Sequence, residues 1–344
     1  MKKVLGIETS CDDTSICILE QSTEFPKILA HKSFTQEEIL KSWGGVVPEI
    51  AARNHLEKIT PLLKSTFEQA NTSVDEIDLI GVTTTPGLLG PLLTGLNAAK
   101  TLSLIFKKPI VPINHLYAHL EAVHLTQKVS YPYLGLLLSG GHSVFFWVQD
   151  KNSFEVIGST IDDAAGEAFD KGGKLMGLGY PAGRVIDELS KTGNPKAYEF
   201  PIGLKSSADA RFSFSGLKTA MRVRLEKEPH LLDKPNPDLC ASYQDAIVRA
   251  ILLKLRYAVK IVKEKYDINS FPLVLGGGVA CNSAIRSAVK DKYKNSFFVE
   301  PKYCTDNGAM IANYALRTHD KAIEYPKCLE LDSRGRFIDK KDFN

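Results

Sequence analysis

The chain has 344 residues, of which 44% are hydrophobic and 24% are charged. This balance is typical of a folded globular protein of one large or two ordinary domains, and it excludes an intrinsically disordered chain. The formal net charge of +3 is too small to indicate a nucleic-acid-binding protein by itself, although it is compatible with a local basic surface.

Strand-like and helix-like segments alternate along the chain, which predicts an α/β fold. In chain order, the expected elements are strands at 4–8 and 15–19, a helix at 49–71, a strand at 79–84, a helix at 92–106, a strand at 110–113, a helix at 115–126, strands at 133–139 and 143–148, a helix at 240–265, a strand at 272–276, and helices at 281–290 and 307–317.

Two segments, 6–15 and 135–143, each place a short polar turn between apolar strands. Backbone N–H groups in such turns can converge on phosphate oxygens, although either turn alone is equally typical of an ordinary hairpin. The repeat predicts a duplicated fold of two lobes. We expect an N-terminal lobe at 1–130, a C-terminal lobe at 131–325 and a tail at 326–344, with the helix near 307–325 able to pack back on the first lobe.

Two histidines, His115 and His119, are four residues apart in the helix expected at 115–126, so they share one face of that helix. They could bind one metal ion, or they could be an ordinary hydrogen-bonded pair. Zinc and iron sites are commonly completed by a carboxylate, with positions left for water or substrate. Asp306, where a loop enters the next helix, is the candidate third ligand, and capping of that helix is its alternative role.

Three other segments combine glycines with polar side chains. Residues 276–282 follow an apolar strand and open a helix, so their backbone could approach a nucleotide, and Asn282 could bind sugar hydroxyls or cap the helix. Residues 162–174 concentrate acidic and basic side chains, which is also typical of a solvated helix face. A rigid turn at 179–184 leads into a helix that carries Asp187 one turn in.

The cellular compartment can be predicted from three features that the sequence lacks: cysteine spacings typical of disulfides, a signal peptide and a transmembrane segment. The six cysteines include no C-x-x-C pair, which predicts free thiols in a reducing environment. The N-terminal residues pass into a strand-like segment without the regions of a signal peptide, and no run is long and apolar enough to predict a transmembrane helix. We therefore expect a cytoplasmic protein without membrane contact.

Together, these motifs resemble those of the tRNA adenosine threonylcarbamoyltransferase family, called TsaD and formerly described as O-sialoglycoprotein endopeptidase. The resemblance covers nearly the whole chain, and the segment 44–51 is similar to the bacterial and organellar branch, which favours the bacterial cytoplasm. The matching motifs lie at 6–14, 44–51, His115 with His119, 139–142, 167–171, 212–219, 277–282 and 305–308.

The resemblance implies an α/β fold of two related lobes of the actin/hexokinase/Hsp70 type (ASKHA), with a ligand cleft between the lobes. It also implies an acyltransferase reaction. The threonylcarbamoyl group passes from threonylcarbamoyl-AMP to the exocyclic N6 amine of the adenosine next to the anticodon, in tRNAs that read codons beginning with A. AMP is released.

The resemblance also implies the site residues. His115, His119 and Asp306 match the metal ligands, one divalent ion per subunit, with Fe²⁺ expected and Zn²⁺ as the alternative. Asp12 is the chosen catalytic group that aids proton removal from the amine. The chain departs from the family's Tyr-Pro-Gly-Gly-Pro motif at Ala182 and Arg184, which leaves the geometry of that turn open. The expected substrate-binding residues are Leu138, Ser139, Gly140, Gly141, His142, Asp170, Gly183, Asp187 and Asn282.

The implied partners are tRNA, a TsaB-type paralogue that lacks the metal histidines, and a TsaE-type P-loop ATPase. The helices at 49–71 and 92–106 are plausible docking surfaces, although their apolar stripes are equally typical of core. Basic side chains that could meet tRNA phosphates, or simply be solvated, are Lys218, Arg222, Arg224, Arg334, Arg336, Lys340 and Lys341.

Three alternative functions remain. A metallopeptidase would need a glutamate after the first histidine, where this chain has Leu116. A small-molecule kinase of the same fold would use magnesium and not histidine ligands. A non-catalytic nucleotide-binding scaffold would lack the metal-binding residues, which this chain retains.

Overall fold

The computed structural model describes residues 2–43 and 45–336. Its contacts divide the chain into two compact units: unit 1 comprises Met1–Val129 and Lys302–Asn344, and unit 2 comprises Ser130–Pro301. Gly44, Lys340 and Lys341, which the sequence analysis singled out, lie outside the described residues.

The segment after residue 301 belongs to unit 1, whereas the sequence analysis assigned residues up to 325 to the second lobe and allowed the helix near 307–325 to pack back on the first. This grouping follows from helix α11 (Gly308–Arg317), which packs on strands of the first sheet. The short helix α10 (Pro301–Cys304) lies at the point where the chain returns to unit 1.

Unit 1 is built on one mixed sheet with the strand order β3-β2-β1-β4-β5. β1 pairs antiparallel with β2 and parallel with β4, and the antiparallel register ends at Glu8 opposite Ser15. The strands are β1 (Lys3–Glu8), β2 (Asp13–Glu20), β3 (Lys27–Thr35), β4 (Leu79–Thr85) and β5 (Ile110–Asn114), and the helices, besides α10 and α11, are α1 (Glu37–Lys41), α2 (Pro48–Ala70), α3 (Leu89–Phe106) and α4 (His115–Glu121).

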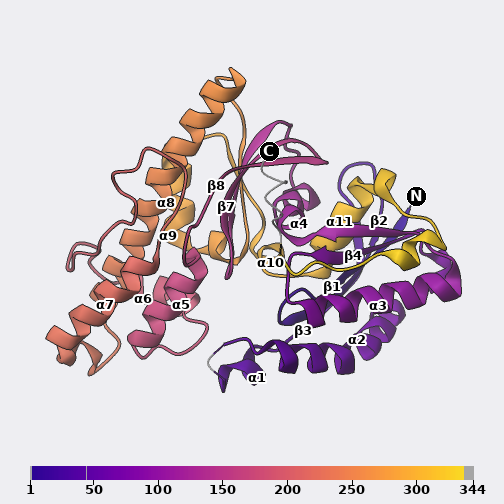
Figure 1. Cartoon of the computed structure of the whole chain (residues 1–344), viewed down its shortest axis with the longest axis horizontal. Coiled ribbons are helices and arrows are strands. Elements are labelled where there is room, and N and C mark those ends of the chain that lie inside the picture. The colour runs from indigo at the N-terminus through magenta and orange to yellow at the C-terminus, as the bar shows by residue number, and fades with distance from the viewer. Residues whose placement is uncertain (1, 44, 337–344) are drawn as a thin grey trace. The chain divides into compact units, whose positions relative to one another are not determined.

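Helices cover both faces of this sheet, and the side chains of β1 alternate between them. Leu5 and Ile7 are fully buried in the core formed with α2 and α3 (Figure 1). Gly6, between them, faces α11: a Cβ atom there would lie 2.3 Å from the carbonyl oxygen of Gly308 and 2.5 Å from the backbone nitrogen of Ala312. The missing side chain therefore lets α11 lie directly against β1.

Unit 2 is built on a second mixed sheet with the strand order β10-β9-β6-β7-β8. β6 pairs antiparallel with β7 and parallel with β9. The strands are β6 (Tyr133–Leu138), β7 (Ser143–Asp150), β8 (Ser153–Ser159), β9 (Leu273–Gly276) and β10 (Ser296–Phe298), and the helices are α5 (Ala165–Leu175), α6 (Gly183–Ser190), α7 (Ser215–Lys227), α8 (Pro237–Tyr266) and α9 (Ser283–Lys292).

The two sheets have the same topology. In each sheet, the first three strands pair antiparallel, and the last two strands extend the sheet parallel to the first strand of the unit. The strands β6, β7, β8, β9 and β10 thus occupy the places of β1, β2, β3, β4 and β5. The predicted α/β fold of two related lobes is confirmed, and the two similar turns lie at the same place in each unit.

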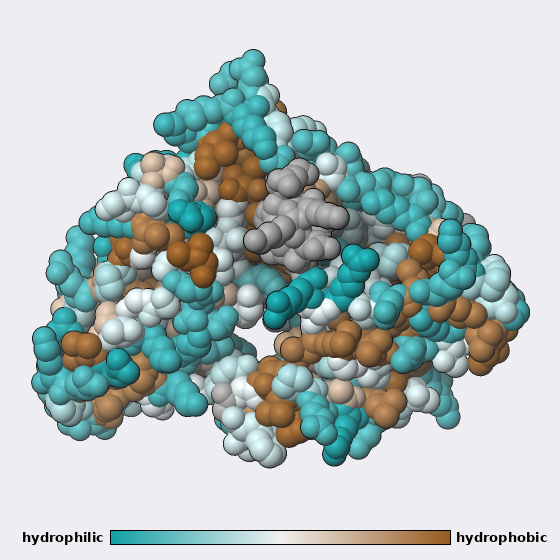
Figure 2. Space-filling view, in the orientation of Figure 1, coloured by the Kyte–Doolittle hydropathy of each residue, from teal (hydrophilic) through white to brown (hydrophobic). Residues whose placement is uncertain are grey.

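Helix α3 is long and apolar enough to cross a membrane by length and composition, contrary to the expectation that no segment is. In unit 1 it packs against α2 and β4, and its buried face includes Leu92 and Leu96. A helix that packs in the core of a globular protein can meet the same criterion of length and apolar composition. Its outer face also carries exposed apolar residues, and Figure 2 shows hydrophobic residues, in brown, over the region of α2 and α3.

Candidate metal centre and nucleotide-binding turns

Helix α4 begins with the first histidine of the pair. Asn114, the last residue of β5, caps this helix, and its side-chain oxygen accepts hydrogen bonds from the backbone nitrogens of Leu116 and Tyr117. His115 and His119 follow one helical turn apart and are almost completely buried, with 7% and 1% of their surface exposed. The helix therefore presents both rings toward the same buried site.

Asp306 lies two residues before the start of α11, and its neighbour Asn307 caps the helix. The side-chain oxygen of Asn307 accepts from the backbone nitrogen of Met310, and its amide nitrogen donates to the carbonyl oxygens of Tyr303 and Thr305. The alternative role of Asp306 as the N-cap is therefore wrong, and its carboxylate is available to the two histidines.

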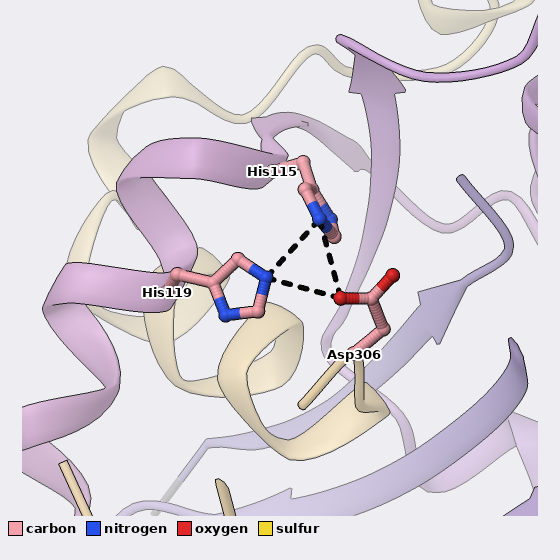
Figure 3. Close-up of side chains that lie close together, drawn as sticks. All are labelled: His115, His119 and Asp306. Carbon is pink, nitrogen blue, oxygen red and sulfur yellow. Dashed lines mark hydrogen bonds and ion pairs between the residues drawn. The ribbon is translucent and has the colours of Figure 1, made fainter. Parts of the chain in front are cut away.

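The three side chains converge on one point (Figure 3). Asp306 Oδ1 lies 3.1 Å from His119 Nε2 and 3.4 Å from His115 Nε2, and the two imidazole Nε2 atoms are 3.1 Å apart. Metal–nitrogen bonds of about 2.0–2.1 Å place neighbouring ligand atoms roughly 3.0–3.4 Å apart, depending on the coordination angle. The spacing fits three ligands of a single small cation.

The electrostatics of the cluster favour a cation. Burial alone would lower the pKa of His115, but the carboxylates of Asp306 and Glu8 raise it well above its ordinary value. Burial and the neighbouring His115 lower the pKa of His119. Burial opposes ionisation of Asp306, yet the two histidines hold the pKa of its carboxyl well below its usual range. The buried carboxylate of Glu8 and the half-buried carboxylate of Asp306, next to two imidazoles, favour positive charge, which a divalent ion would supply.

Glu8 joins the candidate site, although its sequence position alone indicated no role. It is fully buried at the end of β1, and its Oε2 atom lies 3.0 Å from His115 Nδ1. The same carboxylate accepts from the hydroxyl of Thr83 at 2.6 Å and from the backbone nitrogen of Ser10 at 2.5 Å. A carboxylate that accepts a hydrogen bond from Nδ1–H leaves Nε2 with the lone pair, which is the usual arrangement behind a metal-binding histidine.

A buried ion pair holds α4 against α11. Glu121, the last residue of α4, is fully buried, and its Oε2 atom accepts a hydrogen bond of 2.8 Å from Arg317 Nε. The carbonyl oxygen of Glu121 also accepts from the side-chain amide of Asn313. These contacts fix the helix that carries the histidines relative to the helix that follows Asp306.

Asp12 lies in the β1–β2 turn of the same unit. Burial raises the pKa of its carboxyl, and the negative charge of Asp306 raises it further, so the two groups are electrostatically coupled. Its neighbour Asp13 is affected more strongly, since burial and Asp306 raise the pKa of this carboxyl to about 8. The first turn and the start of β2 therefore carry two carboxyls whose pKa is raised by burial and by the charge of Asp306.

The equivalent turn of unit 2, between β6 and β7, contains four of the expected substrate-binding residues, Ser139, Gly140, Gly141 and His142. It is closed by a hydrogen bond from Ser139 N to the carbonyl oxygen of His142 and by another from His142 N to Ser139 Oγ. At Gly140 and Gly141 the space for a Cβ atom is open, so a ligand can approach the backbone closely. Leu138, which precedes the turn, is fully buried.

The glycine turn after β9 lies beside the β6–β7 turn. Gly277 has φ +89°, and a Cβ atom on it would lie 2.3 Å from the carbonyl oxygen of Leu138, so glycine is required there for two reasons. Asn282 caps α9 by accepting from Ile285 N, and its amide nitrogen donates to Gln244. Both ends of the Asn282 amide are thus bonded within the unit.

The remaining expected residues order the loops around α5, α6 and α9. Asp170 accepts from the backbone nitrogen of Ala182, directly before α6 and Gly183. Asp187 accepts from the backbone nitrogen and hydroxyl of Ser283 at the start of α9. The departure at Ala182 is accommodated because Gly173 has no side chain: a Cβ there would lie 2.0 Å from that of Ala182.

Comparison with known proteins identifies the sequence family. The model of the family described as "TsaD: tRNA N6-adenosine threonylcarbamoyltransferase" matches residues 27–313. A protein of that name from Anaeromyxobacter sp. (strain Fw109-5) is 45% identical over 316 residues, which cover 90% of this chain and 92% of the relative. Another from Thermosipho africanus (strain TCF52B) is 44% identical over 335 residues, which cover 95% of this chain and 97% of the relative.

Solved structures resemble the chain in fold. Full-length HypF in its phosphate- and nucleotide-bound form matches with a TM-score of 0.59 and 13% identity, covering 93% of this chain and 46% of HypF. Component A of the (R)-2-hydroxyglutaryl-CoA dehydratase of Acidaminococcus fermentans matches with a TM-score of 0.53 and 14% identity, covering 93% of this chain and all of that one. With the repeated topology, these matches show the actin/hexokinase/Hsp70-type fold.

The family match covers most of the residues in both units, and the relatives align over almost their whole length. The chain belongs to the tRNA N6-adenosine threonylcarbamoyltransferase family.

Proposed function

We propose that the chain transfers a threonylcarbamoyl group from threonylcarbamoyl-AMP to the N6 amine of the adenosine next to the anticodon, in tRNAs that read codons beginning with A, with release of AMP. Membership of the transferase family supports the reaction. The observation that carries the proposal is the convergence of His115, His119 and Asp306 on one point, with Glu8 behind His115.

His115, His119 and Asp306 would hold one divalent cation, Fe²⁺ by resemblance to the family or Zn²⁺ as the alternative. Such an ion supplies Lewis-acid stabilisation of the negative charge that develops on an acyl or phosphoryl oxygen. The protein residues contribute alignment. Glu8 fixes the orientation and tautomer of His115, and the Glu121–Arg317 pair keeps α4 in place.

The turns of unit 2 would bind the adenylate. The open backbone at Gly140 and Gly141 is suited to phosphate or ribose oxygens, and the neighbouring Gly277 turn offers further backbone groups. Asp170 and Asp187 hold these loops in position through Ala182 and Ser283. Because a mixed carbamic–phosphoric anhydride is already activated, alignment and charge stabilisation are the main requirements for the transfer.

Asp12 is the proposed group that helps to remove the proton from the attacking amine. Its place in the β1–β2 turn supports this role, as does the direction of its pKa, which burial and Asp306 raise, because a carboxylate with a higher pKa is a stronger base.

The partners would be a TsaB-type paralogue and a TsaE-type P-loop ATPase, and the chain would act in the cytoplasm. Exposed apolar side chains on the outer surface of α2 and α3, namely Leu56, Leu89, Leu104 and Ile105, support a protein contact on these helices.

The alternative functions are not favoured. Relatives that are 40–45% identical over most of the chain carry the transferase name. The position after the first histidine is held by Leu116, which is fully buried and cannot activate water as a metallopeptidase glutamate would. A scaffold would not need a complete set of ligands with a carboxylate behind one histidine.

The test is to incubate the chain and its two partner proteins with threonine, bicarbonate, ATP and unmodified tRNA, and to measure threonylcarbamoyladenosine by nucleoside mass spectrometry. We expect product with the wild-type chain and none with His119→Ala or Asp306→Ala, both of which should remain folded. Full activity of either variant would contradict the proposed metal role, and no product with the wild type would contradict the proposed function.

A further inference from the structure

Unit 2 contains a cavity of about 460 Å³ that the proposed reaction does not use. It lies where the middle of α8, the C-terminal end of α9 and the segment around residue 202 meet, and α8 and α9 pack side by side (Figure 1). Its lining residues are Ile202, Lys205, Arg249, Leu252, Leu253, Arg256, Tyr257, Lys292 and Tyr293.

The cavity is strongly basic, because four of these residues are cationic and no carboxylate is among them. Arg249 is paired with Asp245 at 2.6 Å. Lys205, Arg256 and Lys292 are exposed and form no ion pair with any residue in the ranges that the structure describes. Three unneutralised cations around one cavity indicate an anionic ligand.

A buried lysine fixes the segment that carries Lys205. Lys254 is 1% exposed, and its Nζ atom donates to the carbonyl oxygen of Leu204 at 2.9 Å and to the hydroxyl of Ser207 at 2.8 Å. It also lies 3.4 Å from the carboxylate of Asp209. Lys205 is therefore presented to the cavity from an ordered turn.

The floor of the cavity combines apolar and aromatic surface. Leu252 and Leu253 provide the apolar part, and Tyr257 and Tyr293 provide two rings. The guanidinium of Arg256 lies 5.1 Å from the centre of the Tyr257 ring, which orients it over the cavity wall. Aromatic rings bordered by cations are typical of surfaces that stack unpaired bases and contact phosphates of a nucleic-acid strand.

A polynucleotide fits this cavity better than a free nucleotide does. Lys292 lies in the last turn of α9, so the backbone there presents the negative end of the helix dipole. Among the described residues that line the cavity, none belongs to a glycine-rich loop or to a helix N-terminus that could offer amides to a terminal phosphate. The cations come from three separate segments, which suits several phosphates along a strand.

Two of the three basic residues that the sequence suggested on α7 are less available, whereas Lys218 is exposed. Arg224 pairs with Glu228 at 2.6 Å, and Arg222 lies 3.9 Å from Glu226. Their charge is partly neutralised on the same helix, as that of Arg249 is, whereas Lys205, Arg256 and Lys292 have no such partner among the described residues.

We propose that this cavity binds the sugar–phosphate backbone of the tRNA. Lys205, Arg256 and Lys292 contact phosphates, and an unstacked base lies against Tyr257 or Tyr293. The inference rests on the proposed function, because that function makes tRNA the substrate.

The test compares two triple variants with the wild type, each in the complex with the partner proteins. The first removes the cavity cations by Lys205→Ala, Arg256→Ala and Lys292→Ala. The matched control, Lys196→Ala, Lys227→Ala and Lys263→Ala, removes the same charge from exposed positions of unit 2 outside the cavity. Binding of unmodified tRNA is measured by fluorescence anisotropy between 50 and 300 mM salt, with AMP as a second probe.

We expect the cavity variant to bind tRNA about tenfold or more weakly, and the slope of log affinity against log salt to fall by about 2–3, since each lost phosphate contact removes about 0.7–0.9 from it. Its KM for tRNA should rise while its KM for threonine and ATP stays constant. The control variant should change little. Equal tRNA binding by the two variants would overturn the proposal, and so would loss of AMP binding with retained tRNA affinity. Absence of product with the wild type concerns the proposed function alone, because the binding measurement still reports on the cavity.

Discussion

Replacing Glu8 by glutamine tests whether this residue prepares His115 for metal binding. Its two carboxylate oxygens accept from three buried donors: His115 Nδ1, the Thr83 hydroxyl and the backbone nitrogen of Ser10. A glutamine side chain replaces one acceptor oxygen with an NH₂ group, so at least one donor would face another donor. An unsatisfied buried donor costs about 1–3 kcal/mol.

The expected consequence is weaker metal binding. Loss of the carboxylate behind a metal-binding histidine typically reduces metal affinity about 10–100-fold, which corresponds to about 1.4–2.8 kcal/mol. Two measurements report on Glu8→Gln: the metal content of the protein as purified, and a competition titration with Zn²⁺ against a chromophoric chelator. Neither of them depends on enzymatic activity.

A matched control is Glu76→Gln, because Glu76 lies in the same unit but is exposed, and it accepts from the backbone nitrogen of Ser73 and from Lys3 Nζ, far from the metal-ligand cluster in the sequence. It should bind metal as the wild type does. The conservative variant Glu8→Asp should recover part of the affinity if its shorter side chain still reaches His115. Wild-type metal affinity in a folded Glu8→Gln protein would refute the argument that this carboxylate sets the tautomer of His115.

Three further outcomes are expected. Gly6→Ala places a Cβ atom 2.5 Å from the backbone nitrogen of Ala312, so we expect a loss of about 1–3 kcal/mol in unfolding free energy and weaker metal binding. The control Gly216→Ala meets nothing within 4 Å and should not destabilise the protein, and chemical denaturation measures both variants. Burial lowers the pKa of His124 to about 4, below its unfolded value of 6.5, so the unfolded chain takes up the proton first as the pH falls. Between pH 7 and pH 5 the free energy of unfolding of the wild type should therefore fall by about 2 kcal/mol more than that of His124→Gln. Parallel pH profiles of the two proteins would contradict this. Metal at 100 times its Kd should stabilise the wild type by about 2.7 kcal/mol, and a chelator should remove this stabilisation. The melting temperature of His119→Ala should be the same with metal and with chelator.

The strands that the sequence predicted are those with continuous apolar runs. Strands β1, β4, β6 and β9 are internal, and their buried patterns are visible as unbroken hydrophobic segments. β3, β8 and β10 were missed because the side chains of these edge strands are mostly half-exposed, which gives a mixed pattern. The edge strand β5 was predicted because most of its side chains are buried. The repeated topology could nevertheless be predicted, because the two similar turns mark the same hairpin.

The members of the candidate site could be predicted only where spacing or motif carried the information. The two histidines are one helical turn apart, so their convergence follows from local geometry. The role of Glu8 depends on β1 and α4 meeting in space, and the sequence signal for it was an acid directly after a fully apolar strand. The choice between Asp306 and Asn307 as helix cap needed the structure, since both residue types favour that position.

Unit 1 is discontinuous in the chain, because it is left after Val129 and resumed at Lys302. During synthesis on the ribosome, the first histidine emerges almost two hundred residues before the carboxylate that completes the triad. The strand face at Gly6 stays uncovered until α11 has also emerged. Loading of the proposed metal would therefore follow translation of nearly the entire polypeptide, and a premature stop before residue 302 would leave both imidazoles without the carboxylate of Asp306.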